Sequence, residues 1–377
     1  MATDLRDADA FVERIAAHAD QAAIEFVLLF FSKALFDADE LARSFARHAP
    51  GLRYGGCSTA GEIAPDGLTD GSALALLFPS AAFLVASALV EDISDSGLGS
   101  VSMEVERLKL SLLGRAGHAA RSNIFAVSLI DGLSFAEERV TSALHLCLDD
   151  IPLLGGSAGD DMRFQGTDLI RDGRVGSDCA LILLVATEIP FRVFKTDNFV
   201  PTEDKLVVTG SDPQQRLVYE INAEPAVAAY SAAIGLLPGD LTPLSFAAHP
   251  VVLKVGGEYY SRSIQRANKD GSLTFFCAID DGIVLTLARA AELVSSTRLA
   301  FQEIEAKLDG IDMILGFDCV LRHLDAQNRQ VTRQMSDLYR LNKVVGFGTY
   351  GEQYRSMHLN QTFTGIAFGS RASRARG

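Results

Sequence analysis

The sequence has no tryptophan and only five cysteines, and its basic residues are outnumbered by acidic ones. The cysteines are odd in number and widely spaced, and no two form a C-x-x-C pair. This pattern excludes a disulfide framework and the usual cysteine-based zinc site. We expect buried free thiols in a reducing compartment, except at Cys57, which stands in a glycine-rich turn where a thiol is more accessible.

Basic residues are too few for a protein that binds phosphate polymers. Lysine and arginine total 34 against 48 aspartates and glutamates, which gives a net charge of −14 at pH 7. Such a surface repels nucleic acid and anionic membranes. A short basic tail at 369–377 contains Arg371, Arg374 and Arg376 and is expected to be a solvated end.

Long hydrophobic runs are also missing. No apolar stretch reaches the ~20 residues that a membrane-spanning helix needs. The start of the chain, Met1 to Asp9, is acidic where a signal peptide would be basic. We therefore predict a cytoplasmic protein that makes no contact with a membrane.

Apolar residues are nevertheless ample, at 48% of 377 residues, and they suffice for more than one core. Strand-like runs alternate with helical patterns, which predicts an α/β fold. The run 26–31 is apolar on both faces, as in a central strand covered on both sides. We predict an N-terminal helix within 1–24, a first domain over 25–215 and a second over 216–368, with a β-rich central part.

A short glycine-rich stretch occurs three times, at 56–62, 155–160 and 346–352. Each copy follows an apolar strand and a helical segment, which indicates repeated strand-helix-turn-strand units, with the middle copy one residue shorter. Equivalent turns converge on one place, and glycine lets backbone N–H groups approach a ligand closely. The predicted ligand site comprises Cys57, Ser58, Thr59, Gly61, Glu62, Ser157, Gly159, Asp160, Gly348, Thr349 and Gly351.

Each copy ends in a carboxylate, namely Glu62, Asp160 or Glu352. Such a group either accepts N–H groups of its own turn or orients a ligand, and the sequence leaves both interpretations open. Three acids without paired histidines do not indicate a transition-metal site. The third copy fits G-x-G-x-x-G, but a strand-like run follows it instead of the helix that a dinucleotide site requires.

At these residues the sequence resembles the FIST proteins, named for F-box and intracellular signal transduction. Residues 55–63 resemble the hallmark of the N-terminal FIST domain, and 155–161 resemble its second motif. Residues 218–222 and 346–362 are similar to the opening and the close of the C-terminal domain. The resemblance covers 25–368. It implies a two-domain α/β architecture and a sensory, ligand-binding module of signal transduction, not an enzyme.

The C-terminal motif also resembles that of stand-alone bacterial members that bind haem and sense nitric oxide. These act on a partner histidine kinase or a cyclic-di-GMP enzyme. The resemblance implies non-covalent haem b with His358 as the axial iron ligand, because no C-x-x-C-H occurs. Glu352 or a backbone carbonyl would hold the second ring nitrogen. The residues available to line such a pocket are Phe347, Tyr350, Tyr354 and Met357.

Two alternatives follow the haem sensor in order of preference. One is a receptor for a small metabolite such as an amino acid, which the turns would bind through backbone N–H groups and Glu62 or Glu352. The other is an enzyme with Cys57 as nucleophile and a histidine nearby. The expected partners are a small-molecule or gas ligand and a histidine kinase or cyclic-di-GMP enzyme. Self-association into a homo-oligomer rests on base rates.

Overall fold

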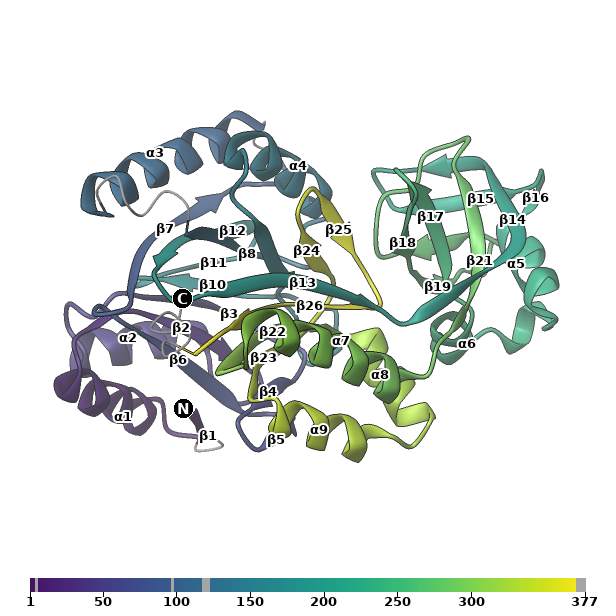
Figure 1. Cartoon of the computed structure of the whole chain (residues 1–377). Helices are drawn as coiled ribbons and strands as arrows, with labels where there is room; N and C mark the ends of the chain where they lie inside the picture. Colours follow the sequence, from purple (N-terminus) through teal and green to yellow (C-terminus); the bar gives the residue numbers. More distant parts are fainter. Residues whose placement is uncertain (4–5, 96–97, 117–122, 371–377) are drawn as a thin grey trace.

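The computed structural model describes residues 1–3, 6–95, 98–116 and 123–370. The arginines of the predicted basic tail lie outside these residues. Within the described part, no helix combines the length and the hydrophobicity needed to cross a membrane. Helices cover the outside of three sheets, and a fourth sheet stands to one side (Figure 1). The predicted α/β class is confirmed.

Three units of one topology build the three sheets. In each unit, an edge strand and a helix precede two parallel strands, which are connected by one or two further helices. A β-hairpin and a last strand, antiparallel to the first parallel strand, complete the unit. The first unit contains β1 (Ala2–Thr3), α1 (Ala8–Gln21), β2 (Ile24–Phe31), α2 (Ala38–His48), β3 (Tyr54–Ser58), β4 (Glu62–Ala64), β5 (Gly67–Thr69) and β6 (Ala73–Pro79).

The other two units repeat this order. The second contains β7 (Phe83–Glu91), α3 (Leu98–Ala116), β8 (Ile124–Ile130), α4 (Glu137–Leu148), β9 (Leu153–Ser157), β10 (Leu169–Arg171), β11 (Arg174–Gly176) and β12 (Cys179–Thr187). The third contains β13 (Phe191–Asp197), α7 (Leu293–Leu308), β22 (Met313–Cys319), α8 (Val320–Asn328), α9 (Thr332–Leu341), β23 (Val344–Thr349), β24 (Glu352–Tyr354), β25 (Met357–Leu359) and β26 (Thr362–Phe368). The repeated strand-helix-turn-strand units predicted from the sequence are therefore present.

Residues 199–290 are inserted into the third unit, between β13 and α7, and we call them the inserted sheet. They comprise β14 (Phe199–Asp212), β15 (Leu217–Ile221), β16 (Glu224–Pro225), α5 (Ala226–Ile234), η2 (Pro238–Asp240), α6 (Pro243–Ala248), β17 (Val251–Val255), β18 (Glu258–Arg262), β19 (Ile264–Ala267), β20 (Leu273–Phe275) and β21 (Val284–Ala290). They enclose a core of their own around Tyr230 and Phe246. The boundary predicted between 215 and 216 falls in the turn between β14 and β15. The sheets thus group the chain differently from that division, and the two-domain boundary stays a prediction.

Each unit gives its hairpin to the sheet of another unit. The β4–β5 hairpin of the first unit pairs with β23 of the third, and the β24–β25 hairpin of the third pairs with β9 of the second. The β10–β11 hairpin of the second unit pairs with β3 of the first. The three exchanges close a ring, so each of the three six-stranded sheets contains strands from two units.

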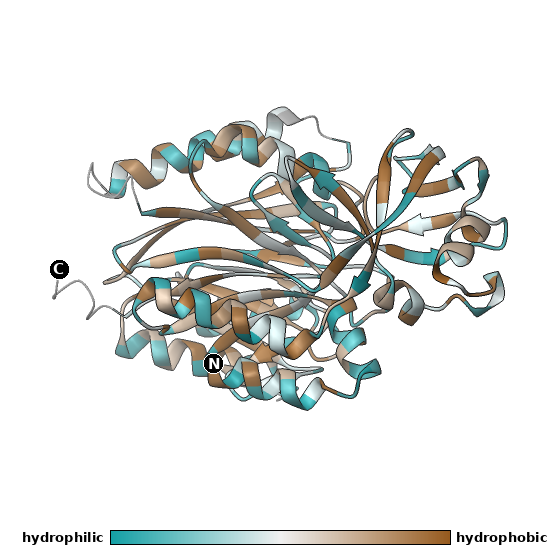
Figure 2. Ribbon diagram, turned by 45° about the vertical axis from the view of Figure 1, so that its right-hand side comes forward, coloured by the Kyte–Doolittle hydropathy of each residue, from teal (hydrophilic) through white to brown (hydrophobic). Residues whose placement is uncertain are grey.

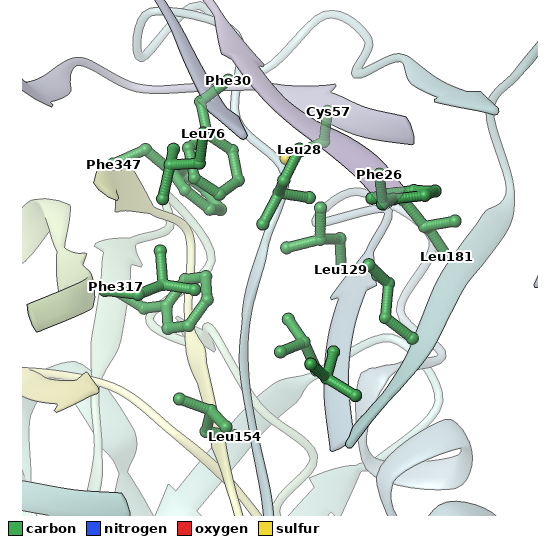
Figure 3. Packing of buried hydrophobic residues seen from close by; sticks show 14 of the residues in the cluster. Phe26, Leu28, Phe30, Cys57, Leu76, Leu129, Leu154, Leu181, Phe317 and Phe347 are labelled. Carbon is green, nitrogen blue, oxygen red and sulfur yellow. The ribbon is translucent and has the colours of Figure 1, made fainter. Parts of the chain in front are cut away.

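Alternation of side chains along the strands produces a core inside the ring and cores outside it. In β2, Phe26, Leu28 and Phe30 point into the shared core, whereas the residues between them pack under α1 and α2. Figure 3 shows these rings and leucines meeting Phe317 and Phe347 from the third unit. Strands of the three sheets are mostly brown in the hydropathy view, while the outer helices alternate in colour (Figure 2). The central strand predicted to be apolar on both faces is confirmed.

Gly56, Gly155 and Gly346 hold the same place in the three units. A Cβ atom at these positions would lie 1.9, 2.0 and 1.8 Å, respectively, from a carbonyl oxygen of the neighbouring parallel strand. The repeated glycine therefore permits close pairing of two strands within each unit.

Candidate functional site

The three glycine-rich turns meet, as predicted, and they bind one another. Each donates a backbone hydrogen bond to another turn: Ala60 N to Gly348 O at 2.9 Å, Gly159 N to Ser58 O at 3.1 Å and Tyr350 N to Ser157 O at 3.2 Å. These bonds form a closed ring at the end of the shared core. The side chains of Ser58, Thr59, Ser157 and Thr349 are fully buried there. The N–H groups of Ala60, Gly159 and Tyr350 are therefore used to join the loops to one another.

Glu62 and Glu352 are buried and have equivalent partners within their own units. Glu62 accepts hydrogen bonds from the hydroxyls of Thr59 and Ser72, and Glu352 accepts them from Thr349 and Thr362. Burial raises the pKa of Glu62 to about 7 and that of Glu352 to about 8. Each carboxyl group also accepts one backbone N–H, from Ser72 or Thr362 respectively, which lies beyond the hairpin and outside the glycine-rich turn. Each carboxyl group ties the start of its hairpin to the strand that follows.

The middle turn differs from the other two in length. Leu169 pairs with β3 as Glu62 pairs with β23 and Glu352 pairs with β9. Glu62 comes two positions after Ala60, whereas Leu169 comes ten positions after Gly159, so the middle unit has eight additional residues. The expectation of a shorter middle copy ending in an equivalent acid is therefore wrong. The additional residues form what we call the middle loop, 161–168.

Asp160 organises the middle loop. Its carboxylate accepts the N–H groups of Phe164, Gln165 and Gly166 at 2.8, 2.6 and 3.0 Å, and it also accepts the hydroxyl of Tyr350. Burial alone would raise the pKa of Asp160, but the hydrogen bonds from Tyr350 and the loop amides lower it below its usual value. The rings of Phe164 and Tyr350 then stack with centroids 4.7 Å apart and an interplanar angle of 19°.

A cavity of about 580 Å³ opens beside this stacked pair. It lies between the residues after β8, the middle loop and the inserted sheet. Its walls are Gly132, Leu133, Phe135, Phe164, Gln214, Gln215, Arg216, Leu217, Gln265, Arg266, Thr274, Phe275, Phe276 and Tyr350. The size and the mixture of aromatic rings with a few polar groups are typical of a small-molecule site. Of the residues predicted from the sequence, Tyr350 alone lines it.

Phe135 and Phe164 at this cavity combine exposure with an uncommon backbone conformation. Their side chains are 51% and 38% exposed, and their φ angles are +57° and +55°. Bulky residues adopt positive φ rarely, because the Cβ atom crowds the following carbonyl group. Strained conformations of this kind collect at ligand sites, where the surrounding structure holds them in place.

Arg216 joins the inserted sheet to the second unit beneath the cavity. Its guanidinium lies 2.5 Å from a carboxylate oxygen of Glu137 and 2.8 Å from one of Glu138, and it donates to the carbonyl of Phe276 at 2.7 Å. The ring of Phe135 lies over it, with the centroid 4.8 Å from Cζ. Arg216 is 3% exposed, and two acids of α4 neutralise its charge in this buried position.

His358 lies behind the cavity wall, 3% exposed. Its Nδ1 is 3.3 Å from Nε2 of Gln353. The predicted contact to Glu352 is therefore absent from the described hydrogen bonds, because Glu352 turns to its two threonines. Nε2 of His358 has no partner among the described residues, and burial lowers the pKa of the ring. Leu68 and Val175 stand at the same place in the other two hairpins, so the third unit replaces an apolar residue by a histidine.

The surroundings of His358 test the predicted haem. A haem bound through Nε2 needs open space beside that atom. The backbone of Gly351 fills it, since a Cβ there would be 2.3 Å from Cε1 and 2.8 Å from Nε2 of the ring. Tyr354 and Met357 are only half-buried, at the tip of the hairpin. The residues present do not fit a haem at His358 in this structure.

Cys57 was expected to be accessible, and that expectation is wrong. It lies in β3 with its thiol in the shared core, fully buried (Figure 3). Burial raises the pKa of Cys57 well above its usual value, which opposes formation of a nucleophilic thiolate. Cys179, Cys277 and Cys319 are buried as expected, and Cys147 is half-buried. Within the described ranges, no group of histidine, cysteine and acidic residues could hold a metal ion.

Sequence reasoning missed Phe135, Phe164 and the residues of the inserted sheet that face them. The available signal was the spacing of the middle copy, because the apolar strand after Asp160 begins only at Leu169. The extra residues include an aromatic side chain in a polar stretch, which is a common sign of a binding loop.

Comparison with known proteins gives the family. Residues 25–224 match the FIST N domain and residues 226–355 match the FIST C domain. The chain is also similar to the uncharacterized protein MJ1623 of Methanocaldococcus jannaschii, at 23% identity over 253 residues. This match covers 58% of the chain and about half (49%) of that protein. FIST domains are sensor domains of signal transduction, and the N domain alone spans more than half of this sequence. The chain belongs to the FIST family.

Proposed function

We propose that this protein is a receptor of signal transduction that binds a small molecule in the cavity between the residues after β8, the middle loop and the inserted sheet. The observation that carries the proposal is the pair Phe135 and Phe164, which are exposed at the cavity in strained backbone conformations. Exposed aromatic rings held in place by the fold supply a rigid apolar contact surface at little entropic cost.

The contacts that link the inserted sheet to the second and third units suit a receptor that changes shape. They include the charged group Arg216–Glu137–Glu138, the bond from Arg262 to the carbonyl of His358 and the bonds of Gln361. Interfaces of such polar character permit relative motion of their two sides. A ligand that touches both sides binds the closed arrangement better and shifts the equilibrium toward it. A histidine kinase or a cyclic-di-GMP enzyme would respond to that shift.

The experiment is a ligand screen with matched variants. Amino acids, aromatic acids and aromatic amines are tested by thermal shift, and the compounds that stabilise the protein are measured by calorimetry. Phe164→Ala should abolish the binding. Tyr219→Ala removes a ring of similar exposure, 41% against 38%, that does not line the cavity, and should leave binding unchanged. Binding that survives Phe164→Ala, or a panel in which no compound binds the unmodified protein, contradicts the proposal.

A haem-based nitric-oxide sensor is the second candidate. The unpartnered Nε2 of buried His358 favours it, although the packing of Gly351 opposes it. A haemin titration of the purified protein and of His358→Ala distinguishes the cases. A stoichiometric Soret band that requires His358 supports the haem sensor, and weak absorbance that is indifferent to the substitution contradicts it.

A further inference from the structure

We infer that the cavity selects an aromatic carboxylate without an amino group. The inference rests on the proposed function, because it concerns the same cavity. Its basis is the distribution of charge around that site. Within the described part of the chain, no aspartate or glutamate lines the cavity, whereas two arginines do. This is unexpected for a protein that contains 48 acidic and 34 basic residues.

The two arginines have different surroundings. Arg216 is buried and its charge is neutralised by Glu137 and Glu138, so it is not available to a ligand. Arg266 is exposed at the cavity, and its Nε donates to the side chain of Asn268 at 3.1 Å. Its two terminal nitrogens have no hydrogen-bond partner among the described residues and can bind a ligand. One free guanidinium matches one carboxylate, which accepts two parallel hydrogen bonds from it.

Among the described residues, no carboxylate lines the cavity to pair with a ligand ammonium group. Acids that contact wall residues are already engaged within the protein. Glu137 and Glu138 bind Arg216, and Glu138 also accepts the N–H of Ala278 at 3.0 Å. Asp160 accepts the hydroxyl of Tyr350, and Asp212 accepts the N–H groups of Gln214 and Gln215. The remaining polar side chains include the neutral amides of Gln214 and Gln215. Removing an ammonium from water without a paired charge is unfavourable. For an amino acid, the cost of desolvating the ammonium group would therefore offset the binding free energy that the carboxylate contributes.

The aromatic rings of the cavity wall determine which apolar group of a ligand binds best. Phe164 and Tyr350 form a stacked pair at the wall, and the ring of Phe276 lies 6.4 Å from that of Phe164. A flat ring extends such a stack more favourably than a branched aliphatic chain does. The cavity thus combines an aromatic surface with a single cationic group.

Three compounds with the same phenyl ring separate the contribution of the carboxylate from that of the ammonium group. Phenylacetate carries only the carboxylate, phenethylamine only the ammonium, and L-phenylalanine both. We expect calorimetry to give phenylacetate the highest affinity, with L-phenylalanine weaker by about tenfold or more and phenethylamine weaker still. Arg266→Gln should lower the affinity for phenylacetate by about tenfold or more and abolish the preference for phenylacetate over the two amines. Arg333→Gln changes an exposed arginine of α9 outside the cavity and should have no effect.

The outcomes distinguish the inference from the proposed function. Equal affinities for the three compounds, or tightest binding of L-phenylalanine, with loss in Phe164→Ala, would overturn the inference and leave the receptor in place. Tight phenylacetate binding that is insensitive to both Arg266→Gln and Phe164→Ala would overturn both. If none of the three compounds binds while another member of the wider panel binds in a Phe164-dependent manner, only the inference fails.

Discussion

The hydroxyl of Tyr350 donates a hydrogen bond to the carboxylate of Asp160, across 190 positions of sequence and between two different units. The same carboxylate holds the amides of the middle loop. This one group therefore decides where the ring of Phe164 lies relative to that of Tyr350. Asp160, predicted as a ligand contact, is in this structure a residue that positions the cavity wall.

Asp160→Asn should disturb this wall more than Tyr350→Phe does. An asparagine presents an NH₂ group in place of one carboxylate oxygen, so some of the part-buried amides of the middle loop lose their acceptor. We expect the free energy of unfolding to fall by about 1–3 kcal/mol. Tyr350→Phe removes one hydrogen bond and keeps the stacked ring, with an expected loss of about 1 kcal/mol. Urea unfolding measures both, and equal effects would contradict the positioning role.

Stability should fall as the pH rises, through Glu62 and Glu352. Their folded pKa values of about 7 and about 8 lie above the ordinary value of 4.5. Between about pH 4.5 and these values the folded chain binds more protons than the unfolded chain. The free energy of unfolding therefore decreases by up to about 1.4 kcal/mol per pH unit for each group, and the full contribution is present only below pH 4.5.

Glu352→Gln isolates this effect, because glutamine resembles the protonated acid. The variant should gain stability relative to the unmodified protein between pH 5 and pH 8, as measured by urea unfolding at several pH values. Glu303→Gln, at a glutamate with a 74% exposed side chain, serves as the control and should follow the unmodified protein. A pH-independent difference for Glu352→Gln would show that the carboxyl group does not titrate in this range.

Arg216→Met should be strongly destabilising. The substitution leaves the side chain of Glu137, 1% exposed, without its counter-charge, and the expected loss is about 3–5 kcal/mol. Arg174→Met breaks the exposed pair with Glu91, in which the side chains are 53% and 47% exposed, and should change stability by less than about 1 kcal/mol. Comparable losses in the two variants would contradict the account of the buried cluster.

Thiol labelling should find one reactive cysteine in the folded protein. Cys147 is half-buried, whereas the other cysteines are buried, and burial raises the pKa of Cys57. Ellman's reagent should therefore titrate about one thiol under native conditions and all five after denaturation. Cys147→Ser should abolish the native signal. Rapid native labelling of Cys57 would instead revive the enzyme interpretation.

Gly155→Ala should destabilise the second unit, because the new Cβ would lie 2.0 Å from the carbonyl oxygen of Ser128 and would separate β8 from β9. Gly114→Ala is the matched control. Gly114 lies in α3 with nothing within 4 Å of the added atom, and alanine there should stabilise the helix by about 0.5–1 kcal/mol. Thermal unfolding should thus shift in opposite directions for the two variants. A tolerated Gly155→Ala would refute the close-pairing explanation.

Local patterns in the sequence are sufficient to predict the fold class, the repeated units and the convergence of the three turns. The apolar strand at 26–31 and the triplicated glycine stretch are features of adjacent residues, so periodicity reveals them. The hairpin exchange is not local. Whether Ile63 pairs beside Gly346 depends on contacts between distant strands, which no short window of sequence contains.

The functional residues illustrate the same limit. The glycines beside Cys57 predict a turn residue. In the strand that it actually occupies, a shift of one residue in register decides whether the thiol faces the core or the solvent. The partners of backbone N–H groups are likewise invisible in the sequence, so the turns were expected to bind a ligand where they bind one another. The neighbours of His358 in the chain predict an iron ligand. Its burial against Gly351 comes from the pairing of β24 with β25.

The ring of exchanged hairpins has a consequence for biosynthesis. The amide of Leu68, in the hairpin of the first unit, bonds to Ser336, which is 268 positions further along the chain. On the ribosome this hairpin emerges long before its partner strand β23 exists, and its edge stays unpaired until β23 has been synthesised. Until β23 has been made, the first hairpin presents an unpaired strand edge that can associate with other extended chains. Chaperones that bind extended segments would therefore meet this protein early, at the first hairpin.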